Sequence, residues 1–190
     1  HTTTHDFWNK ISKSCMKYMF SSFEENKFLI NCLKKNQNLS VLDYGCASGY
    51  LKRFLGLYFN SNLKYTGVDL SIKSIELAKK NYGDGFFTDT DYENSNISSK
   101  KFDIVYSRYT VVHQDDPWKF LEKLISRTNN FLIIKLKTRD LGATELSVEK
   151  SCQMQAGETW APYIVLNYNE LLEFLKKSKF NYIKTNRSYS

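Results

Sequence analysis

The chain has 190 residues, of which 42% are hydrophobic and 15% aromatic, and 27 basic residues against 20 acidic ones give it a net charge of +7. This composition excludes collagen-like, low-complexity and disordered chains and predicts one globular domain with a substantial core. No apolar run approaches the roughly 20 residues of a membrane-spanning helix, so we expect no membrane partner. The four cysteines form no CxxC pair and no metal-like group with the three histidines, which predicts a reducing cytoplasm and no metal site.

The basic excess consists of 22 lysines and 5 arginines that are spread along the chain. Such a spread is typical of a solvated lysine-rich surface, whereas patches that bind nucleic acid cluster on one face, so a nucleic-acid partner is possible but not favoured. The chain begins with His1 and shows no signal-peptide pattern, and we therefore expect it to be part of a longer or processed polypeptide. Nothing in the pattern sets the oligomeric state.

Apolar residues recur at helical spacing over residues 6–36, which predicts one or two amphipathic helices that pack on the rest of the chain as a cap. We therefore divide the chain into an N-terminal helical cap, residues 1–37, and a main domain, residues 38–190. The apolar positions that carry this pattern are Phe7, Trp8, Ile11, Met16, Met19, Phe20, Phe23, Phe28, Leu29 and Leu33.

From Ser40 onwards, short apolar runs alternate with helical segments. Buried strands are predicted at residues 41–44, 65–68, 85–87, 102–106 and 131–134, and helices at about 49–59, 72–82 and 117–127. The last of these helices has Asp116 as its N-cap and Pro117 at its first position. This alternation predicts a doubly wound α/β domain with a parallel sheet that is covered on both faces.

The C-terminal part of the sequence is less regular. Residues 138–167 carry no clear element and predict an active-site lid or a disordered loop. A helix is expected at 168–179 and a sixth strand at 180–185, with residues 163–166 as an alternative strand.

The turn after the first strand is the expected ligand site, because open α/β sheets bind ligands at the carboxyl end of their strands. It contains Gly45, Ala47 and Gly49, which keep the turn small, and Asp69 follows where the second strand ends. A carboxylate there can accept hydrogen bonds from both hydroxyls of a ribose. The third small position falls one residue too early for a dinucleotide fingerprint, and the chain has no phosphate-binding P-loop.

These segments together resemble the class I S-adenosylmethionine-dependent methyltransferases over residues 40–135. The turn is similar to the Gly-Cys-Ala-x-Gly form of that family's first motif, and residues 66–71 and 87–89 are similar to its second and third strands. Residues 102–107, followed by Val111-Val112-His113, match its fourth strand and the segment after it. The resemblance implies a Rossmann-like, mostly parallel sheet of seven strands, the last of them missing from this chain or misassigned, and S-adenosylmethionine as cofactor.

The resemblance also implies roles for residues of this chain. Asp43 would help to hold the ammonium of the cofactor's amino-acid tail, Asp69 would bind the ribose, and Asp89 would contact the adenine amino group. The full set of cofactor-binding residues that it implies is Asp43, Gly45, Cys46, Ala47, Gly49, Asp69, Leu70, Asp89 and Ser107.

Candidates for chemistry and acceptor binding follow the fourth strand. His113 suits a general base, although histidine at this place also lines pockets or is structural, and Tyr109, Asp115 and Asp116 are rivals. Arg108 would bind an anionic group of the acceptor or form a surface salt bridge, and the basic stretch 135–139 has the same two interpretations. Trp160 and Tyr163 belong to a lid over the acceptor, or to a loop that packs on the core through Trp160.

Absent motifs narrow the acceptor. Residues 107–110, Ser-Arg-Tyr-Thr, differ from the Asn/Asp-Pro-Pro-aromatic motif of amino-group methyltransferases, and Arg108 stands where one group of ribose methyltransferases has Asp. We therefore expect a methyltransferase that acts on a polar small molecule, at a hydroxyl of a sugar or natural-product intermediate. The alternatives are an RNA methyltransferase and a module that binds S-adenosylmethionine without turnover.

Overall fold

The computed structural model describes residues 11–59, 63–155 and 159–187. Contacts divide the chain into two compact units, each of which is built from separate segments. Unit 1 contains His1–Ser107 and Arg127–Ile134, and unit 2 contains Arg108–Ser126 and Lys135–Ser190. The two units are described one after the other.

Unit 1 begins with the two expected amphipathic helices, α2 (Lys13–Ser22) and α3 (Glu24–Lys35). The Ser12 hydroxyl caps α2 by accepting a hydrogen bond from the Cys15 N–H at 3.2 Å. Met16, Leu29 and Leu33 are fully buried in a cluster that also contains strand residues. The helical cap therefore shares its hydrophobic core with the sheet; Phe7 and Trp8 lie outside the described residues.

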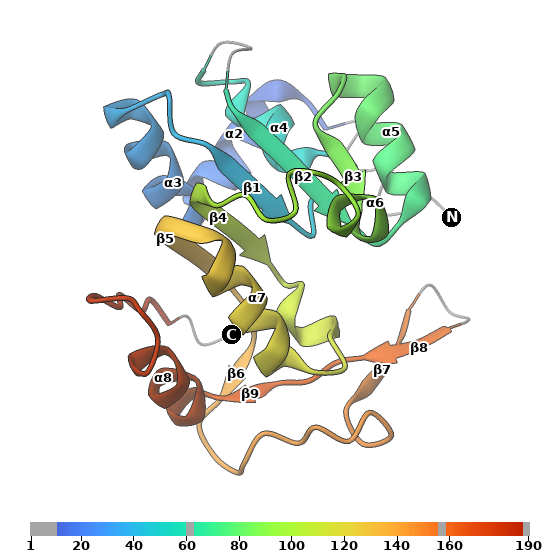
Figure 1. Cartoon of the computed structure of the whole chain (residues 1–190), viewed down its shortest axis with the longest axis vertical. Coiled ribbons are helices and arrows are strands. Elements are labelled where there is room, and N and C mark those ends of the chain that lie inside the picture. Colours follow the sequence, from blue (N-terminus) through green and yellow to red (C-terminus); the bar gives the residue numbers. More distant parts are fainter. Residues whose placement is uncertain (1–10, 60–62, 156–158, 188–190) are drawn as a thin grey trace. The chain divides into compact units, whose positions relative to one another are not determined.

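A five-stranded sheet forms the centre of unit 1 (Figure 1). Its strands are β1 (Val41–Tyr44), β2 (Tyr65–Asp69), β3 (Phe86–Thr88), β4 (Phe102–Arg108) and β5 (Thr128–Lys135), in the order β3-β2-β1-β4-β5. The pairs β1–β2, β1–β4 and β2–β3 are parallel. This order places β1 at the middle of the sheet, so the turn after β1 lies beside the ends of β2 and β4. The five predicted strands and the Rossmann-like α/β fold are confirmed.

Three further helices belong to unit 1: α4 (Tyr50–Leu55), α5 (Ile72–Tyr82) and α6 (Asp89–Glu93). Phe54 of α4 and Ile75 and Ala78 of α5 join the buried cluster of α2 and α3, so these four helices share one core with the sheet. The α6 helix was not predicted from the sequence. The sequence feature that indicates this helix is its N-cap residue, because the Thr88 hydroxyl accepts a hydrogen bond from the Asp91 N–H at 3.1 Å.

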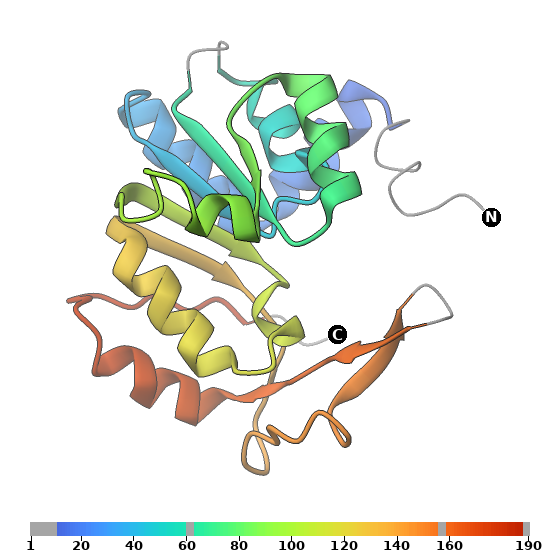
Figure 2. The same cartoon turned by 45° about the vertical axis from the view of Figure 1, so that its right-hand side comes forward.

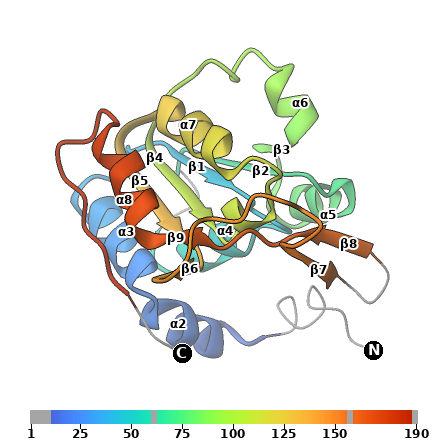
Figure 3. The same ribbon diagram turned by 90° about the horizontal axis from the view of Figure 1, so that it is seen from below.

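Unit 2 contains a short 3₁₀ helix, η1 (Val111–His113), and two α-helices, α7 (Pro117–Arg127) and α8 (Tyr168–Lys176). The Asp116 carboxylate accepts from the Lys119 N–H at 3.0 Å, which confirms the predicted N-cap of α7. Trp118 and Phe174 pack with ring centroids 5.1 Å apart, and α7 and α8 run side by side in Figures 2 and 3. The predicted helix at 168–179 is thus present and ends slightly earlier.

The region expected to lack clear elements contains four short strands, which corrects that expectation. They are β6 (Thr138–Arg139), β7 (Cys152–Gln155), β8 (Thr159–Pro162) and β9 (Leu166–Asn167). The β7 and β8 strands form an antiparallel hairpin, and β6 pairs with β9. Residues 163–165 form no strand, and only Leu166 of that alternative segment belongs to one.

The predicted sixth strand at residues 180–185 is wrong, because this segment is neither helix nor strand. It contains Phe180, Tyr182 and Ile183, which favour a strand, but none of its side chains is buried and Tyr182 is 79% exposed. A strand is stable only when it is paired and one face is covered. Within the described residues the central sheet accordingly has five strands rather than the seven that the resemblance implies.

Two features are absent from the described residues. None of the helices there is long and apolar enough to cross a membrane. No three side chains of the His, Cys, Asp or Glu type lie close enough together, within those same residues, to hold a metal ion.

Candidate functional site

The turn after β1 adopts a backbone that only small residues accept easily. Gly45, Ala47 and Gly49 all have positive φ angles, of 89°, 48° and 85°. The N–H groups of Gly45 and Cys46 both donate to the Val68 carbonyl of β2, at 2.7 and 3.0 Å. The turn is therefore fastened to the neighbouring strand, and the small residues expected from the sequence are required by its backbone.

Asp69 links this turn to the start of α5. One of its carboxylate oxygens accepts from the Ala47 N–H at 2.8 Å, and the other accepts from the Ser71 N–H at 2.9 Å. A carboxylate oxygen has two lone pairs, so each keeps the capacity for a further hydrogen bond. The structure thus brings Asp69 and the turn together, as the ribose-binding hypothesis requires, and gives Asp69 an additional role in shaping the turn.

Asp43 is buried beneath the turn and accepts a hydrogen bond from the Tyr65 hydroxyl at 2.5 Å. Burial raises the pKa of Asp43 to about 7; the Tyr65 hydrogen bond opposes this shift and the charge of Asp69 adds to it. Burial, and then the negative charge of Asp43, raise the pKa of Tyr65 well above its usual range. Tyr65 was not among the predicted site residues, although a tyrosine that begins a buried strand needs a partner for its hydroxyl.

Cys46 is buried in the same turn. Burial, and then the charges of Asp43 and Asp69, raise the pKa of its thiol, so the thiol stays neutral. Its sulfur would lie 2.9 Å from a Cβ placed on Gly67, which shows how closely β2 approaches the turn. Cys46 is therefore closely packed between the turn and β2, as expected of a small buried side chain.

The remaining predicted cofactor residues of unit 1 differ in their surroundings. Asp89, at the end of β3, accepts a hydrogen bond from the Tyr44 hydroxyl at the end of β1, so the ends of these strands are linked by side chains. Leu70 is 84% exposed. Ser107 at the end of β4 and Ser48 in the turn are buried, and within the described structure their hydroxyls have no hydrogen-bond partner.

These features fit the cofactor that the sequence implies. A buried hydroxyl without a partner loses free energy, typically about 1–3 kcal/mol, and a polar ligand at the turn removes that penalty. The turn has small residues where a ligand must approach the backbone, and Asp69 has spare acceptor capacity beside it. Unit 1 therefore offers donors and acceptors for a polar nucleoside at the end of β1.

In unit 2, His113 lies on η1 and its Nδ1 is 2.9 Å from the Pro162 carbonyl oxygen. A carbonyl can only accept, so Nδ1 carries a proton, and in the neutral form of the ring Nε2 has the lone pair. The Ile164 N–H donates to the Val112 carbonyl at 2.7 Å, and the Tyr163 ring centroid is 5.7 Å from that of His113. The end of the β7–β8 hairpin is thus held against η1, and His113 and Tyr163 are brought together.

Trp160, the other predicted lid residue, is largely exposed. It is 63% exposed and lies opposite Met154, itself exposed, in the β7–β8 hairpin. The alternative in which the loop packs on the core through Trp160 is therefore wrong. Asp115 and Asp116 are also exposed, and Asp116 caps α7, which accounts for its position without a role in chemistry.

Arg108 and Tyr109 meet a third residue at the end of β4. Tyr109 has a φ angle of 59°, and its N–H donates to the Lys135 carbonyl at 2.7 Å. The Arg108 guanidinium carbon lies 5.2 Å from the Tyr109 ring centroid, and the Lys135 Nζ lies 5.9 Å from it. Arg108 and Lys135 were separate candidates from the sequence, because a contact between the ends of two strands is not visible there.

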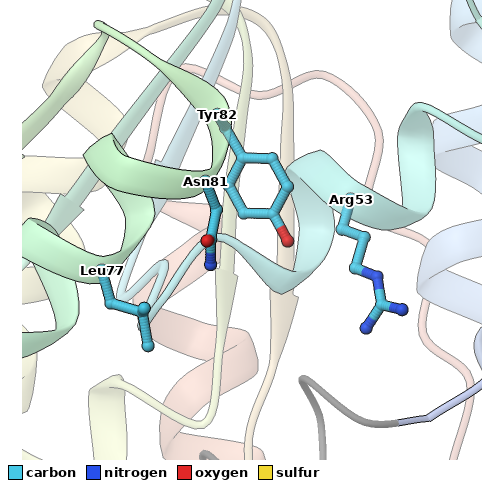
Figure 4. A pocket seen from close by; sticks show the side chains of 4 residues that line it. All are labelled: Arg53, Leu77, Asn81 and Tyr82. Carbon is cyan, nitrogen blue, oxygen red and sulfur yellow. The ribbon is translucent and has the colours of Figure 1, made fainter.

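A pocket of about 400 Å³ opens elsewhere in unit 1, between α4 and α5 (Figure 4). Arg53, Leu77, Asn81 and Tyr82 line it, and Arg53 donates a hydrogen bond to the Ile11 carbonyl at 2.8 Å. Burial raises the pKa of Tyr82, and the charge of Arg53 partly opposes this. None of the four lining residues is among the predicted site residues.

Three comparisons place the chain among known proteins. Over 80 residues it is 35% identical to a malonyl-[acyl-carrier protein] O-methyltransferase of Priestia megaterium, a match that covers 42% of this chain and 26% of that protein. The chain thus spans about a quarter of the length of this curated relative. Its fold is similar to that of magnesium protoporphyrin IX methyltransferase from Synechocystis with bound S-adenosylhomocysteine, with a TM-score of 0.58, 19% identity, and coverage of 86% of this chain and 75% of that one.

A carbon methyltransferase, CurJ, also has a similar fold, with a TM-score of 0.66, 13% identity, and coverage of 99% of this chain and 54% of that one. At these identities the two solved structures establish the fold alone. The family model described as a methyltransferase domain matches residues 35–186, most of the chain. This match establishes that the chain belongs to the methyltransferase domain family. Its cofactor is S-adenosylmethionine, whose product S-adenosylhomocysteine is bound in a solved structure of similar fold.

Proposed function

We propose that this protein transfers a methyl group from S-adenosylmethionine to a hydroxyl of a polar small molecule. The observation that carries the choice of a hydroxyl is the hydrogen bond of His113 Nδ1 to the Pro162 carbonyl, because it leaves Nε2 able to accept a proton. A hydroxyl must lose its proton when its oxygen is methylated, so it needs such a base.

The residues of unit 1 would hold the cofactor. Asp69 would accept the ribose hydroxyls through its spare lone pairs, the turn of Gly45, Ala47 and Gly49 would allow close approach to the backbone, and Asp43 would balance the ammonium of the amino-acid tail. When bound, S-adenosylmethionine supplies a methyl group that is activated by its sulfonium. Asp89 at the end of β3 would contact the adenine.

His113 would accept the acceptor's proton at Nε2 while Nδ1 continues to donate to the Pro162 carbonyl. That carbonyl orients the ring and stabilises the positive charge that the imidazole then gains. Proton transfer by a well-placed base contributes about 10²–10⁴-fold to a rate. Tyr163 and Trp160 of the hairpin region, together with Arg108, would contact the acceptor.

Two observations support a small-molecule acceptor and a cytoplasmic location. The curated relative from Priestia megaterium is named an O-methyltransferase, and the malonyl group in its name is a small acid on a carrier. Within the described residues all four cysteines are free thiols, which is consistent with a reducing cytoplasm. We infer a cytoplasmic enzyme with a small-molecule acceptor.

The test combines cofactor binding with methyl transfer. Calorimetry with S-adenosylhomocysteine should show micromolar binding, and Asp69→Ala should weaken it by about 1–3 kcal/mol, because its polar partners then lack an acceptor. Transfer of labelled methyl to a panel of hydroxyl compounds should fall about 100-fold or more in His113→Gln, while cofactor affinity stays as in the wild type.

The controls separate the alternatives. Wild-type protein that does not bind S-adenosylhomocysteine would contradict the whole proposal. Binding without transfer to any acceptor would indicate a module without turnover, and salt-sensitive binding and methylation of RNA would favour a nucleic-acid substrate. Unchanged turnover in His113→Gln would remove His113 from the mechanism.

A further inference from the structure

Two cationic side chains and one aromatic ring gather in unit 2 where β4 and β5 end. We call these residues, Arg108, Tyr109 and Lys135, the Tyr109 cluster. The guanidinium carbon of Arg108 lies 5.2 Å from the ring centroid of Tyr109, and the ammonium of Lys135 lies 5.9 Å from it. All three residues are half-buried, so bulk water screens their charges less than on an open surface.

Main-chain geometry holds the ring in this place. Tyr109 has a φ angle of 59°, a left-handed conformation that is unfavourable for a non-glycine residue. Its N–H is bonded to the Lys135 carbonyl at 2.7 Å, and this bond joins the two chain segments that carry the cations. Because the bond uses the Lys135 main chain, the Lys135 side chain can be changed without breaking it.

The two cations both lie against the same ring. The face of an aromatic ring attracts each cation, whereas the two positive charges repel each other. An anion bound by both cations offsets this repulsion. Arg108 presents a planar fork of donors that matches a carboxylate, and Lys135 presents a compact charge that can complete its coordination.

We propose that the Tyr109 cluster is the binding site for a carboxylate of the methyl acceptor; this inference rests on the proposed function and adds the acceptor's chemical class to it. Arg108 and Lys135 bind the carboxylate oxygens, and the ring of Tyr109 serves as the platform on which both cations rest. In this assignment the Tyr109 hydroxyl takes no part, so Tyr109 is a positioning residue and not a base.

The experiment measures binding of matched compounds to the full chain saturated with S-adenosylhomocysteine. The probes are the malonyl and acetyl thioesters of N-acetylcysteamine, which differ by one carboxylate. Calorimetry should show that the malonyl compound binds at least about tenfold more tightly, since a hydrogen bond to a charged group is stronger than one between neutral groups. We call the affinity for the malonyl compound divided by that for the acetyl compound the thioester ratio. Arg108→Gln and Lys135→Met should each reduce the thioester ratio about tenfold or to unity.

Matched variants define the site. Lys137→Met removes the same charge from an exposed lysine two positions away and should leave the ratio unchanged. Tyr109→Phe should leave the ratio of the two thioester affinities unchanged, since the ring is retained, and Tyr109→Leu should lower that ratio. Circular dichroism and affinity for S-adenosylhomocysteine show whether each variant is folded.

Three results would overturn the proposal. The first is equal binding of the two thioesters, and the second is a ratio of their affinities that Lys135→Met and Lys137→Met change alike. The third is inorganic phosphate that competes with the malonyl compound as strongly as malonate does, which would make the cluster a general oxyanion site. Failure of the proposed function is seen separately, as absent methyl transfer or absent binding of S-adenosylhomocysteine, and in the second case the two thioesters are compared on the chain alone.

Discussion

The burial of Asp43 makes the stability of unit 1 depend on pH. Its pKa is raised to about 7 in the folded chain, mainly by burial, against about 3.9 in an unfolded chain. Between these values the folded state binds a proton that the unfolded state has already lost. Asp43 therefore makes its full contribution to stability below about pH 4, and that contribution is lost as the pH rises through 7.

We predict that the free energy of unfolding of the wild type falls by roughly 3 kcal/mol between pH 5 and pH 8 relative to that of Asp43→Asn. The asparagine has no charge to bury and can still accept the hydrogen bond of Tyr65. Urea denaturation of both proteins at a series of pH values measures this difference. If the free energies of unfolding of the two proteins change with pH in parallel, Asp43 is ionised in the folded chain at all these pH values.

Close packing of neighbouring elements fixes the shape of the turn. Gly67 lies in the middle of β2, and a Cβ on it would lie 2.6 Å from the Phe86 ring and 2.9 Å from the Cys46 sulfur. We predict that Gly67→Ala lowers the free energy of unfolding by about 1–3 kcal/mol, because the core cannot expand freely. Guanidinium denaturation measures this loss.

Gly56→Ala is the control, since Gly56 has helical φ and ψ angles and the nearest atom to its new Cβ would be 3.3 Å away. It should change stability by much less. Phe86→Leu should restore part of the loss in the double variant, because the smaller side chain makes room. If the effects of Gly67→Ala and Phe86→Leu on the free energy of unfolding are strictly additive, the clash of the new methyl group is not with Phe86.

The elements that could be predicted are those with a strong local pattern. The buried runs of β1, β2 and β4 and the capped helix α7 were located within a few residues, because a continuous apolar stretch favours a buried strand and an Asp-Pro start favours a helix. The β7–β8 hairpin was missed, since the paired Met154 and Trp160 are exposed and the pairing of the two strands is not visible in the sequence. Of the candidate site, Asp69 and the turn followed from spacing, but the contacts of Lys135 with Tyr109 and of His113 with Pro162 depend on which distant segments meet.

At the scale of the whole molecule, the helices α2 and α3 are part of a shared core. Met16, Leu29 and Leu33 are fully buried there, and burying each such side chain contributes about 1.5–3 kcal/mol. The three together approach the total stability of a typical domain, about 5–15 kcal/mol. We therefore predict that a chain lacking residues 1–37 does not unfold cooperatively and binds a hydrophobic dye.

Thermal unfolding and dye fluorescence of the shortened and the complete chain test this. Met16→Leu serves as the control, because it preserves the volume and apolar character of a buried position and should cost less than about 1.5 kcal/mol. A shortened chain with a sharp, near-normal unfolding transition would instead make residues 38–190 an autonomous domain.

The division of unit 1 into two chain segments has a consequence for synthesis on the ribosome. The chain leaves this unit after Ser107 and returns only at Arg127, and β5 supplies the outer partner of β4. At about 5–20 residues per second, β4 exists for seconds before its neighbour is made. During that interval its outer N–H and C=O groups are unpaired, and such an edge can pair with another nascent chain. The timing of translation between β4 and β5 therefore bears on the yield of folded protein.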